Sequence, residues 1–250
     1  MMKLVIGGAS GYLGTEVVRQ ALKHPGISSV VALGRRPTPI PEGSGSQAET
    51  SKFKSVTIDD FCNYSEQVKA DIAGADGCIW LIAITPTRSK LMEWEEVRKI
   101  CHDYAVTAAD EFAKIPRDGK TEPLRFLYIS GANAVRDPAK KPWILGDMCL
   151  MRGGVEAAVL ERAQQSNGAM QACVYRPGLI IQADTSAVKR ALWGASRSLI
   201  SLPAIELHEM GAALLDQAVN GFSKDLVLNP ELIEIGQKAL EKGKEGKEGN

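Results

Sequence analysis

Residues 3–14, KLVIGGASGYLG, place an apolar run directly before glycines spaced G-x-x-G-x-x-G. Glycine at the turn permits a positive φ. The bare backbone at Gly11 and Gly14 allows close approach of a pyrophosphate and close packing of helix on strand. The first N–H groups of the following helix, with its dipole, then face the phosphates. The alternative is an ordinary glycine-rich turn, but the flanking strand and helix favour a dinucleotide site made by Gly8, Ser10, Gly11, Tyr12, Leu13 and Gly14.

The rest of the chain repeats this alternation of short apolar runs and longer amphipathic stretches. The pattern is typical of a parallel sheet with helices on both faces, because strands buried on both sides are almost continuously apolar. We therefore predict an α/β fold of the Rossmann type, a doubly wound parallel sheet with a small C-terminal substrate-capping region. Strands are expected at 3–7, 29–34, 54–58, 77–83, 125–130 and 171–176, and helices at about 12–23, 60–73, 90–115 and 143–165.

Composition divides the chain into three parts. Residues 1–181 form the predicted NAD(P)-binding Rossmann core, in which the polar segment 37–52 is expected to be a mobile surface loop without a helix. Residues 182–240 form a small C-terminal substrate region packed on the same domain, and 186–202 has the period of an amphipathic helix. The charged, glycine-containing segment 241–250 is expected to be a disordered tail.

Charge and composition restrict the partners. Of the 250 residues 44% are hydrophobic, and the 30 basic and 30 acidic side chains cancel. This balance favours no nucleic-acid partner, and no run approaches the roughly 20 apolar residues of a membrane span. The N-terminus lacks the apolar stretch of a signal peptide, so we expect a cytoplasmic protein. The 5 cysteines and 3 histidines show no metal-ligand spacing, and no metal site is predicted.

Residues after the second, third and fourth predicted strands indicate which dinucleotide is bound. An NAD site usually has an acidic residue about 20 positions after the glycines, but GRRP stands there. Arg35 and Arg36 match a 2′-phosphate, so NADP(H) is favoured, and a solvated basic pair is the alternative. Asp59 is placed to accept from the adenine amino group, unless it only caps a helix. Thr85 and Thr87 would lie along the cofactor.

Taken in order, these motifs resemble a known family. Over roughly residues 3–181 the chain is similar to the atypical short-chain dehydrogenase/reductase superfamily, and within it to the Tat-interacting-protein-type and NmrA-like NAD(P)-binding proteins and their fungal relatives. The resemblance implies a Rossmann core, NADP(H), cofactor contacts at Pro177 and Gly178, and a C-terminal region that shapes the substrate pocket. The segments that carry it are GGASGYLG, VVALGRRP, TIDDF, AITPTRSK, FLYIS, RGGVEAAVLE and YRPGLI.

The reaction residues of that family are altered in this chain. The family's catalytic Tyr and the Lys four residues later align with Met148 and Arg152, and Ser130 is the nearest match to the catalytic hydroxyl after the fifth strand. Met has no proton to give, whereas Arg stays charged and can stabilise an oxyanion without acting as an acid. Arg152 could therefore still polarise a substrate carbonyl, but neither residue could donate a proton to it. The alternative is structural: Met148 fills the core and Arg152 pairs with Glu156.

Other side chains could supply the proton or shape the pocket. Trp143 and Trp193 could line an apolar substrate cavity. The bare backbone of Gly153 and Gly154, unfavourable inside a helix, indicates that a cofactor or another helix approaches closely. The candidate proton donors are Asp147, Cys149, Tyr12, Tyr104, Tyr128 and His208.

Three functions fit these residues. The first is an NADPH-dependent reductase acting on a small hydrophobic carbonyl substrate or an enone. The second is a non-redox cyclase or isomerase of specialised metabolism, an enzyme of biosynthesis on the same fold. The third is a catalytically inactive regulator that senses NADP(H). The residues leave open whether two copies form a homodimer.

Overall fold

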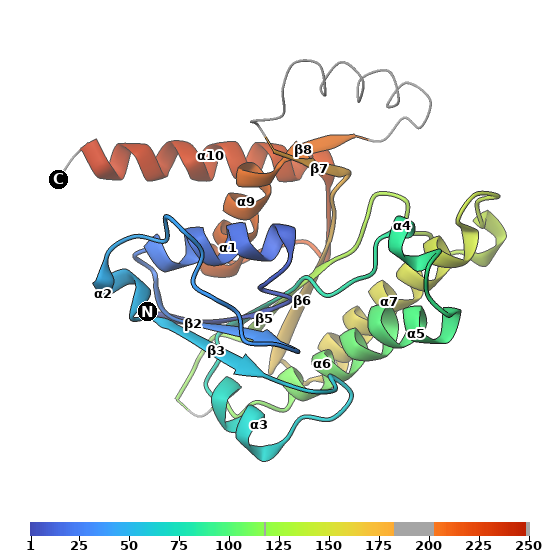
Figure 1. Ribbon diagram of the computed structural model, residues 1–250, viewed down its shortest axis with the longest axis horizontal. Helices are drawn as coiled ribbons and strands as arrows, with labels where there is room; N and C mark the ends of the chain where they lie inside the picture. Colours follow the sequence, from blue (N-terminus) through green and yellow to red (C-terminus); the bar gives the residue numbers. More distant parts are fainter. Residues whose placement is uncertain (118, 183–202, 249–250) are drawn as a thin grey trace.

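The structure is a computed structural model that describes residues 1–117, 119–182 and 203–248. Its centre is a seven-stranded parallel sheet in the order β3-β2-β1-β4-β5-β6-β9 (Figure 1). The strands are Met2–Gly7 (β1), Ile27–Gly34 (β2), Phe53–Thr57 (β3), Gly77–Trp80 (β4), Leu124–Ile129 (β5), Met170–Arg176 (β6) and Leu226–Leu228 (β9).

The strand order reverses direction at β1. The chain first moves outward from β1 to β2 and β3, and it then returns to place β4 on the other side of β1. Leu4 therefore lies in register with Val30 on one side and with Gly77 on the other. Doubly wound sheets bind their ligands outside the carboxyl ends of the strands at such a reversal. The predicted Rossmann-type fold is confirmed.

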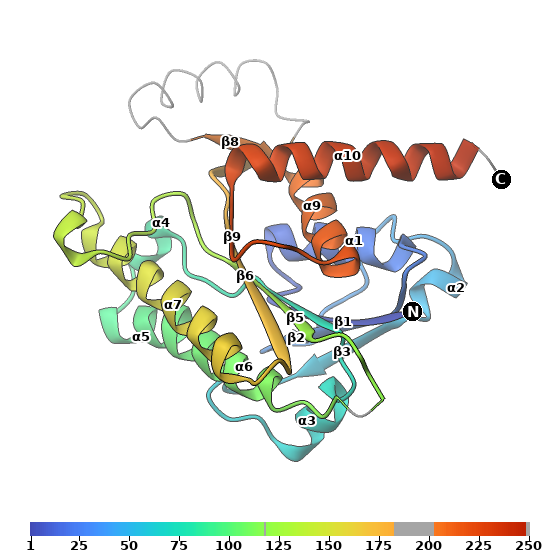
Figure 2. The ribbon, with the colours of Figure 1, turned by 180° about the vertical axis from the view of Figure 1, so that it is seen from behind.

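Helices cover both faces of the sheet (Figures 1 and 2). One face carries Tyr12–Lys23 (α1), Leu207–Asn220 (α9) and Asn229–Glu248 (α10), and the other carries Glu66–Ile72 (α3), Trp94–Arg98 (α5), Tyr104–Ala113 (α6) and Gly146–Gln165 (α7). Each face has its own buried apolar cluster against the sheet. This two-sided burial explains why the strands read as continuous apolar runs.

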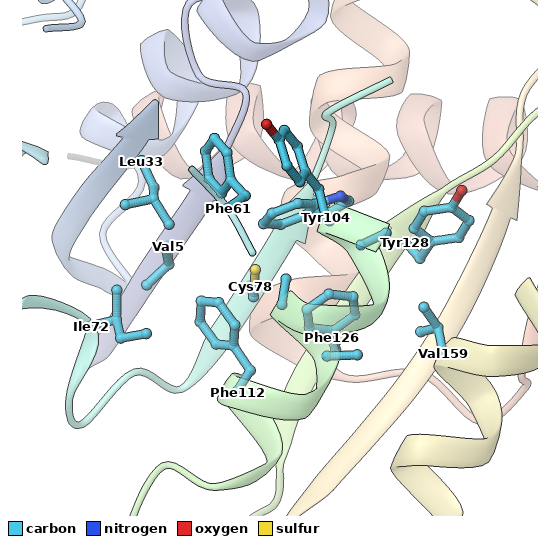
Figure 3. Close-up of a cluster of buried hydrophobic side chains, with 14 of the residues drawn as sticks. Val5, Leu33, Phe61, Ile72, Cys78, Tyr104, Phe112, Phe126, Tyr128 and Val159 are labelled. Atoms are coloured by element: carbon cyan, nitrogen blue, oxygen red, sulfur yellow. The ribbon is translucent and has the colours of Figure 1, made fainter. Parts of the chain in front are cut away.

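Aromatic side chains fill the core beneath α6 (Figure 3). Trp80, the last residue of β4, is fully buried, and its ring meets that of Phe61 edge to face at 5.4 Å. The same indole lies against the end of β1, because a Cβ added to Gly7 would stand 2.7 Å from the ring. Such a contact fixes the ends of β1 and β4 relative to each other. The two strands therefore form a rigid base for the loops that follow them.

Several predicted elements have different limits in the structure. The helix predicted at 12–23 is confirmed as α1, whereas the helix predicted at 60–73 begins only at Glu66, because the Ser65 side chain caps it by accepting from the N–H of Val68. The helix predicted at 90–115 is divided, since a π-helical turn, Lys99–Asp103, separates α5 from α6. Within that turn the Cys101 thiol accepts a hydrogen bond from the N–H of Ile84.

Two polar segments hold more helix than their composition predicts. Segment 37–52 contains a helical turn, Gln47–Thr50 (α2), so the prediction of a loop without a helix is wrong there. Its cause is a capping box: the Ser46 side chain accepts from the N–H of Glu49, and the Glu49 carboxylate accepts from the N–H of Ser46 at 2.7 Å. Similarly, α10 continues to Glu248, into the segment predicted as a tail. Its Glu and Lys residues are good helix formers.

The C-terminal part of the chain contributes to the central sheet. β9 lies within residues 182–240 and adds the seventh strand by pairing with β6. With three residues it is too short for a periodic signal. A separate two-stranded sheet joins Leu179–Ile181 (β7) to Ala204–Glu206 (β8). The helix predicted at 186–202 lies outside the described residues.

Candidate functional site

The glycine turn after β1 has the geometry of an open anion site. Gly8 has φ +83°, a conformation that favours glycine, and its N–H donates to the carbonyl of Leu33 in β2 at 3.1 Å. A Cβ on Gly14 would stand 2.3 Å from the Gly8 carbonyl oxygen, so only glycine fits there. Gly11 caps α1 without a side-chain hydrogen bond, and the first turn of α1 has no acidic residue. The first N–H groups of α1 are therefore left for a ligand.

The predicted cofactor residues in this turn contribute in different ways. Ser10, Gly11 and Tyr12 are exposed, and the Tyr12 ring stands beside the turn with 54% of its surface accessible. Leu13 is buried in the core against α9 and β1, so only its backbone faces the turn. Burial and the nearby Glu16 raise the pKa of the Tyr12 phenol, which makes it a weak proton donor.

The two predicted phosphate-binding arginines, Arg35 and Arg36, stand at the end of β2, beside the glycine turn. Arg35 and Arg36 are exposed, and neither makes an ion pair with a described residue. Asp59, after β3, is also exposed and has no hydrogen bond within the described chain. The suggestion that Asp59 caps a helix is wrong, since Ser65 caps α3 and it is Asp60 that binds Lys99. All three side chains are thus available to a ligand.

The segment after β4 contains predicted cofactor residues and borders a cavity, which is the second part of the candidate site. Thr85 caps the short helix Pro86–Ser89 (α4) through its backbone, without a side-chain hydrogen bond, and Thr87 lies within α4. Both threonines are exposed. Pro86 lines a cavity of about 230 Å³ at the carboxyl ends of the strands. The other residues of this cavity are Gly131, Ala132, Asn133, Leu145, Met148, Cys149, Arg152, Pro177, Gly178 and Leu179.

Pro177 and Gly178 form one wall of this cavity. The N–H of Ala132 donates to the Pro177 carbonyl at 2.9 Å, and the N–H of Gly178 donates to Oδ1 of Asn229 at 2.7 Å. A Cβ on Gly178 would stand 1.9 Å from the carbonyl oxygen of Pro203. Packing against residue 203 therefore requires the bare backbone at Gly178, whatever ligand binds beside it.

Arg152 is the cation of the cavity. Its guanidinium is half-buried and lies against Gly131, where an added Cβ would stand 2.5 Å from Nη1. Its hydrogen bond within the described chain is a long one, 3.4 Å, from Nη2 to the carbonyl of Ile84. No carboxylate of the described residues pairs with it, so the alternative of an Arg152–Glu156 ion pair is wrong. Met148, one turn earlier, both lines the cavity and belongs to the apolar core.

Glu156 is bound instead by two other arginines. Its carboxylate is fully buried and accepts from Nε of Arg136 at 2.8 Å and from Nε of Arg176 at 2.8 Å. Arg136 follows the cavity residues 131–133, and Arg176 precedes Pro177. Glu156 therefore ties the loops after β5 and β6 to α7. It holds two walls of the cavity in place.

The reason for glycine at positions 153 and 154 of α7 differs from the one predicted. A Cβ on Gly153 would stand 1.9 Å from the carbonyl oxygen of Val135, and nothing lies within 4 Å of a Cβ on Gly154. Neither a cofactor nor another helix requires Gly153. The loop after β5 does, because it packs directly on α7, and the N–H of Val135 donates to the Cys149 carbonyl.

The candidate proton donors are widely separated. Cys149 lines the cavity, and burial raises the pKa of its thiol against the opposing charge of Arg152. Asp147 is exposed and bound to Lys141, and His208 lies 3.4 Å from Glu206. Tyr104 and Tyr128 are buried in the core, where loss of solvation raises the pKa of each phenol. Among the predicted donors, Cys149 lines the same cavity as Arg152, whereas Tyr128 lies near Arg152 but is buried in the core.

Two further predictions concern single side chains. Ser130 directly follows the last residue of β5, and its hydroxyl is buried without a hydrogen-bond partner among the described residues. Trp143 is 99% exposed and does not line the cavity, so that prediction is wrong. Trp193 lies outside the described residues. Asn133 and Leu145 also line the cavity, and no local pattern indicates them, because their place depends on how the loop after β5 packs on α7.

Two other kinds of site, metal clusters and membrane spans, concern the described residues only. Within residues 1–117, 119–182 and 203–248, no three His, Cys, Asp or Glu side chains are placed to hold a metal ion. None of the helices described is long and apolar enough to cross a bilayer.

No family model matches the sequence. Protein FMP52, mitochondrial, of Candida albicans is 30% identical over 133 residues, 53% of each chain. Leucinostatins biosynthesis cluster protein T of Purpureocillium lilacinum is 28% identical over 129 residues, which are 52% of this chain and 42% of that protein. The chain thus spans about half the length of the curated relatives it matches.

Solved structures extend the likeness over almost the whole chain. Vestitone reductase from alfalfa has a TM-score of 0.63 and 14% identity, covering 92% of this chain and 76% of that one. WbmF of Bordetella bronchiseptica, in complex with NAD+, has a TM-score of 0.65 and 11% identity, covering 96% and 78%. The chain has a Rossmann fold. At these identities the likeness concerns the fold.

Features of this Rossmann fold are compatible with a bound dinucleotide. A Cβ at Gly14 would close the turn that the phosphates need. The guanidinium groups of Arg35 and Arg36 lie in solvent beside that turn, without ion pairs among the described residues. The buried Ser130 hydroxyl, at the carboxyl end of β5, has an unsatisfied donor and acceptor. The residues present therefore fit the cofactor of the fold family.

Proposed function

We propose that the chain is an NADP(H)-dependent oxidoreductase of the short-chain dehydrogenase/reductase type that reduces a hydrophobic carbonyl compound or enone. The observation that carries this proposal is the Arg152 guanidinium, which faces an apolar cavity without a carboxylate partner in the described chain. The cavity and the glycine turn lie at the carboxyl ends of adjoining strands, where Rossmann folds place substrate and cofactor. Vestitone reductase, with the same fold, is by its name a reductase.

The residues that would hold the cofactor lie along one edge of the sheet. Gly8, Ser10, Gly11 and Gly14, with the first N–H groups of α1, would bind the diphosphate. Arg35 and Arg36 would bind the 2′-phosphate, and Asp59 would accept from the adenine. Thr85, Thr87, Pro177 and Gly178 would lie along the nicotinamide half. When bound, the reduced cofactor supplies a hydride.

The chain's own residues then act on the substrate oxygen. Arg152 donates N–H groups to that oxygen and stabilises negative charge on it, as preorganised donors do in a cavity that excludes water. Arg152 itself keeps its proton, because a guanidinium is not deprotonated in proteins and therefore acts only as a hydrogen-bond donor. The raised pKa of Cys149 keeps its thiol protonated at neutral pH, so Cys149 can give a proton to the oxygen. Met148 contributes an apolar part of the cavity wall.

The direct test is incubation of the chain with NADPH and an apolar ketone or enone such as 2-cyclohexenone. Loss of NADPH absorbance together with a product two hydrogens heavier supports the proposal. We expect Arg152→Met to lower kcat about 100-fold or more, as loss of an oxyanion donor does. A product of unchanged mass with intact NADPH would contradict it and favour a cyclase or isomerase. Binding of NADPH with no turnover of any such compound would favour a sensor.

The choice of cofactor has its own prediction. Arg35→Asp should weaken NADPH binding about 30-fold, which is about 2 kcal/mol, because a charge-assisted hydrogen bond to the 2′-phosphate is replaced by repulsion. NADH binding should change by less than about threefold. Calorimetric titration with both dinucleotides measures the two effects. Lys114→Asp, an exposed charge at the end of α6, is the matched control. Equal losses for both dinucleotides would remove the reason for preferring NADP(H).

A further inference from the structure

The cavity beside α7 carries a positive charge that the described protein does not neutralise. Arg152 lies among neutral groups: the Gly131 backbone, the Ile84 carbonyl, and the Cys101 and Cys149 thiols, whose raised pKa values its charge opposes. The rest of the lining is apolar except for the Asn133 amide. A half-buried guanidinium without a counter-ion is uncommon, because partial desolvation of the charge has no compensation.

The acidic residues nearest in sequence are engaged elsewhere. Glu156, one helical turn after Arg152, is fully buried between Arg136 and Arg176. Asp147, in the first turn of α7, is exposed and bound to Lys141. The two arginines around Glu156 exceed its single negative charge, so they add to the positive charge on this side of α7 instead of reducing it.

We propose that the substrate supplies the missing counter-ion, and that it is a small apolar oxo acid whose carboxylate binds Arg152. The guanidinium fork presents parallel N–H groups at the spacing of two carboxylate oxygens, which a neutral ketone does not match. The remaining wall, from Pro86, Leu145, Met148 and Leu179, suits an alkyl group. This inference rests on the proposed function for the reacting carbonyl, but the binding of a carboxylate does not depend on it.

The size of the cavity limits the acid. About 230 Å³ is below the range of about 300–1,000 Å³ for sites of drug-sized ligands. A chain of roughly six carbon atoms therefore suits the described walls better than a long acyl chain.

Calorimetry with simple probes tests the inference without any turnover. Hexanoate, 1-hexanol and hexylamine share an alkyl group and differ in charge. For the native chain we expect hexanoate to bind at least about tenfold more tightly than hexanol, and hexylamine not to bind. Arg152→Met should remove the preference for hexanoate and leave hexanol binding within about twofold. Arg152→Lys should keep part of the preference, because it keeps the charge and loses the fork.

The matched control is Arg88→Met. Arg88 is an exposed cation of α4 that does not line the cavity, so the preference for hexanoate should be unchanged in this variant. Equal affinity of the native chain for hexanoate and hexanol would overturn the inference, and so would a preference that survives Arg152→Met or disappears in Arg88→Met. Titration with NADPH in the same samples separates the two proposals: failure to bind NADPH counts against the proposed function, and loss of carboxylate preference counts against this inference.

Discussion

Replacement of Glu156 by alanine should lower the free energy of unfolding by about 3–5 kcal/mol. The carboxylate is fully buried, and the side chains of Arg136 and Arg176 that bind it are only 36% and 17% exposed. Without Glu156 these two cations would face each other with no compensating charge. Urea unfolding followed by circular dichroism measures the change. If the dependence of the unfolding free energy on urea concentration is the same for both proteins, the two-state assumption holds.

Two variants of the same helix make this prediction specific. Glu156→Gln keeps the shape and one acceptor, so we expect a smaller loss than for alanine. Glu161→Ala removes an exposed carboxylate that pairs with Arg162 at 3.5 Å, and its effect should be within about 0.5 kcal/mol. If Glu156→Ala destabilises the chain no more than Glu161→Ala, then Glu156 does not hold the loops after β5 and β6 on α7.

Gly14→Ala should reduce the affinity for NADPH about 100-fold or more. The added methyl group would stand 2.3 Å from the Gly8 carbonyl oxygen and 2.8 Å from the backbone of Ala9. The turn would have to move away from α1, and its N–H groups would no longer converge on one anion. We also expect a loss of stability of about 1–3 kcal/mol, as for other overpacked sites. Calorimetric titration of samples with native circular dichroism separates the two effects.

Gly154→Ala provides the contrast for this variant. Nothing lies within 4 Å of a Cβ at Gly154, which stands in the interior of α7. Alanine should therefore stabilise the chain by about 0.5–1 kcal/mol and leave NADPH binding unchanged. NADPH binding by Gly14→Ala that equals the native affinity would show that the glycine turn is not the phosphate site.

The sequence predicted those features that depend on neighbouring residues. The apolar runs of β1, β2, β4, β5 and β6 and the start of α1 follow from local patterns, and so does the glycine turn between β1 and α1. Gly14 is an example, because the residues that exclude a side chain there, Gly8 and Ala9, are six and five positions away. The spacing of residues in a short motif can therefore indicate such a contact directly.

Features that depend on distant residues could not be predicted in this way. Helical spacing indicated Glu156 as the partner of Arg152, but Arg136 and Arg176, each 20 residues away, bind it instead. Gly153 is needed because the loop after β5 folds onto α7, and no pattern around Gly153 reports that loop. β9 is a strand only because the exposed edge of β6 pairs with it. In each case tertiary contacts decide the outcome.

Met148 and Arg152, which the sequence resemblance places at the Tyr and Lys positions of short-chain dehydrogenases, define the chemical question. In the structure both side chains line one cavity, and Met148 also packs in the apolar core. Cys149 lines the same cavity, and burial raises the pKa of its thiol. In the proposed function, Arg152 would polarise the substrate oxygen and Cys149 would protonate it, without a phenol.

Calorimetric titration of the native chain with NADPH and NADH tests the central claim most directly, because every proposed step requires a dinucleotide at the glycine turn. We predict that NADPH binds with one site per chain, at least about tenfold more tightly than NADH, through Arg35 and Arg36. Heat changes no greater than those of dilution for both dinucleotides would contradict the account.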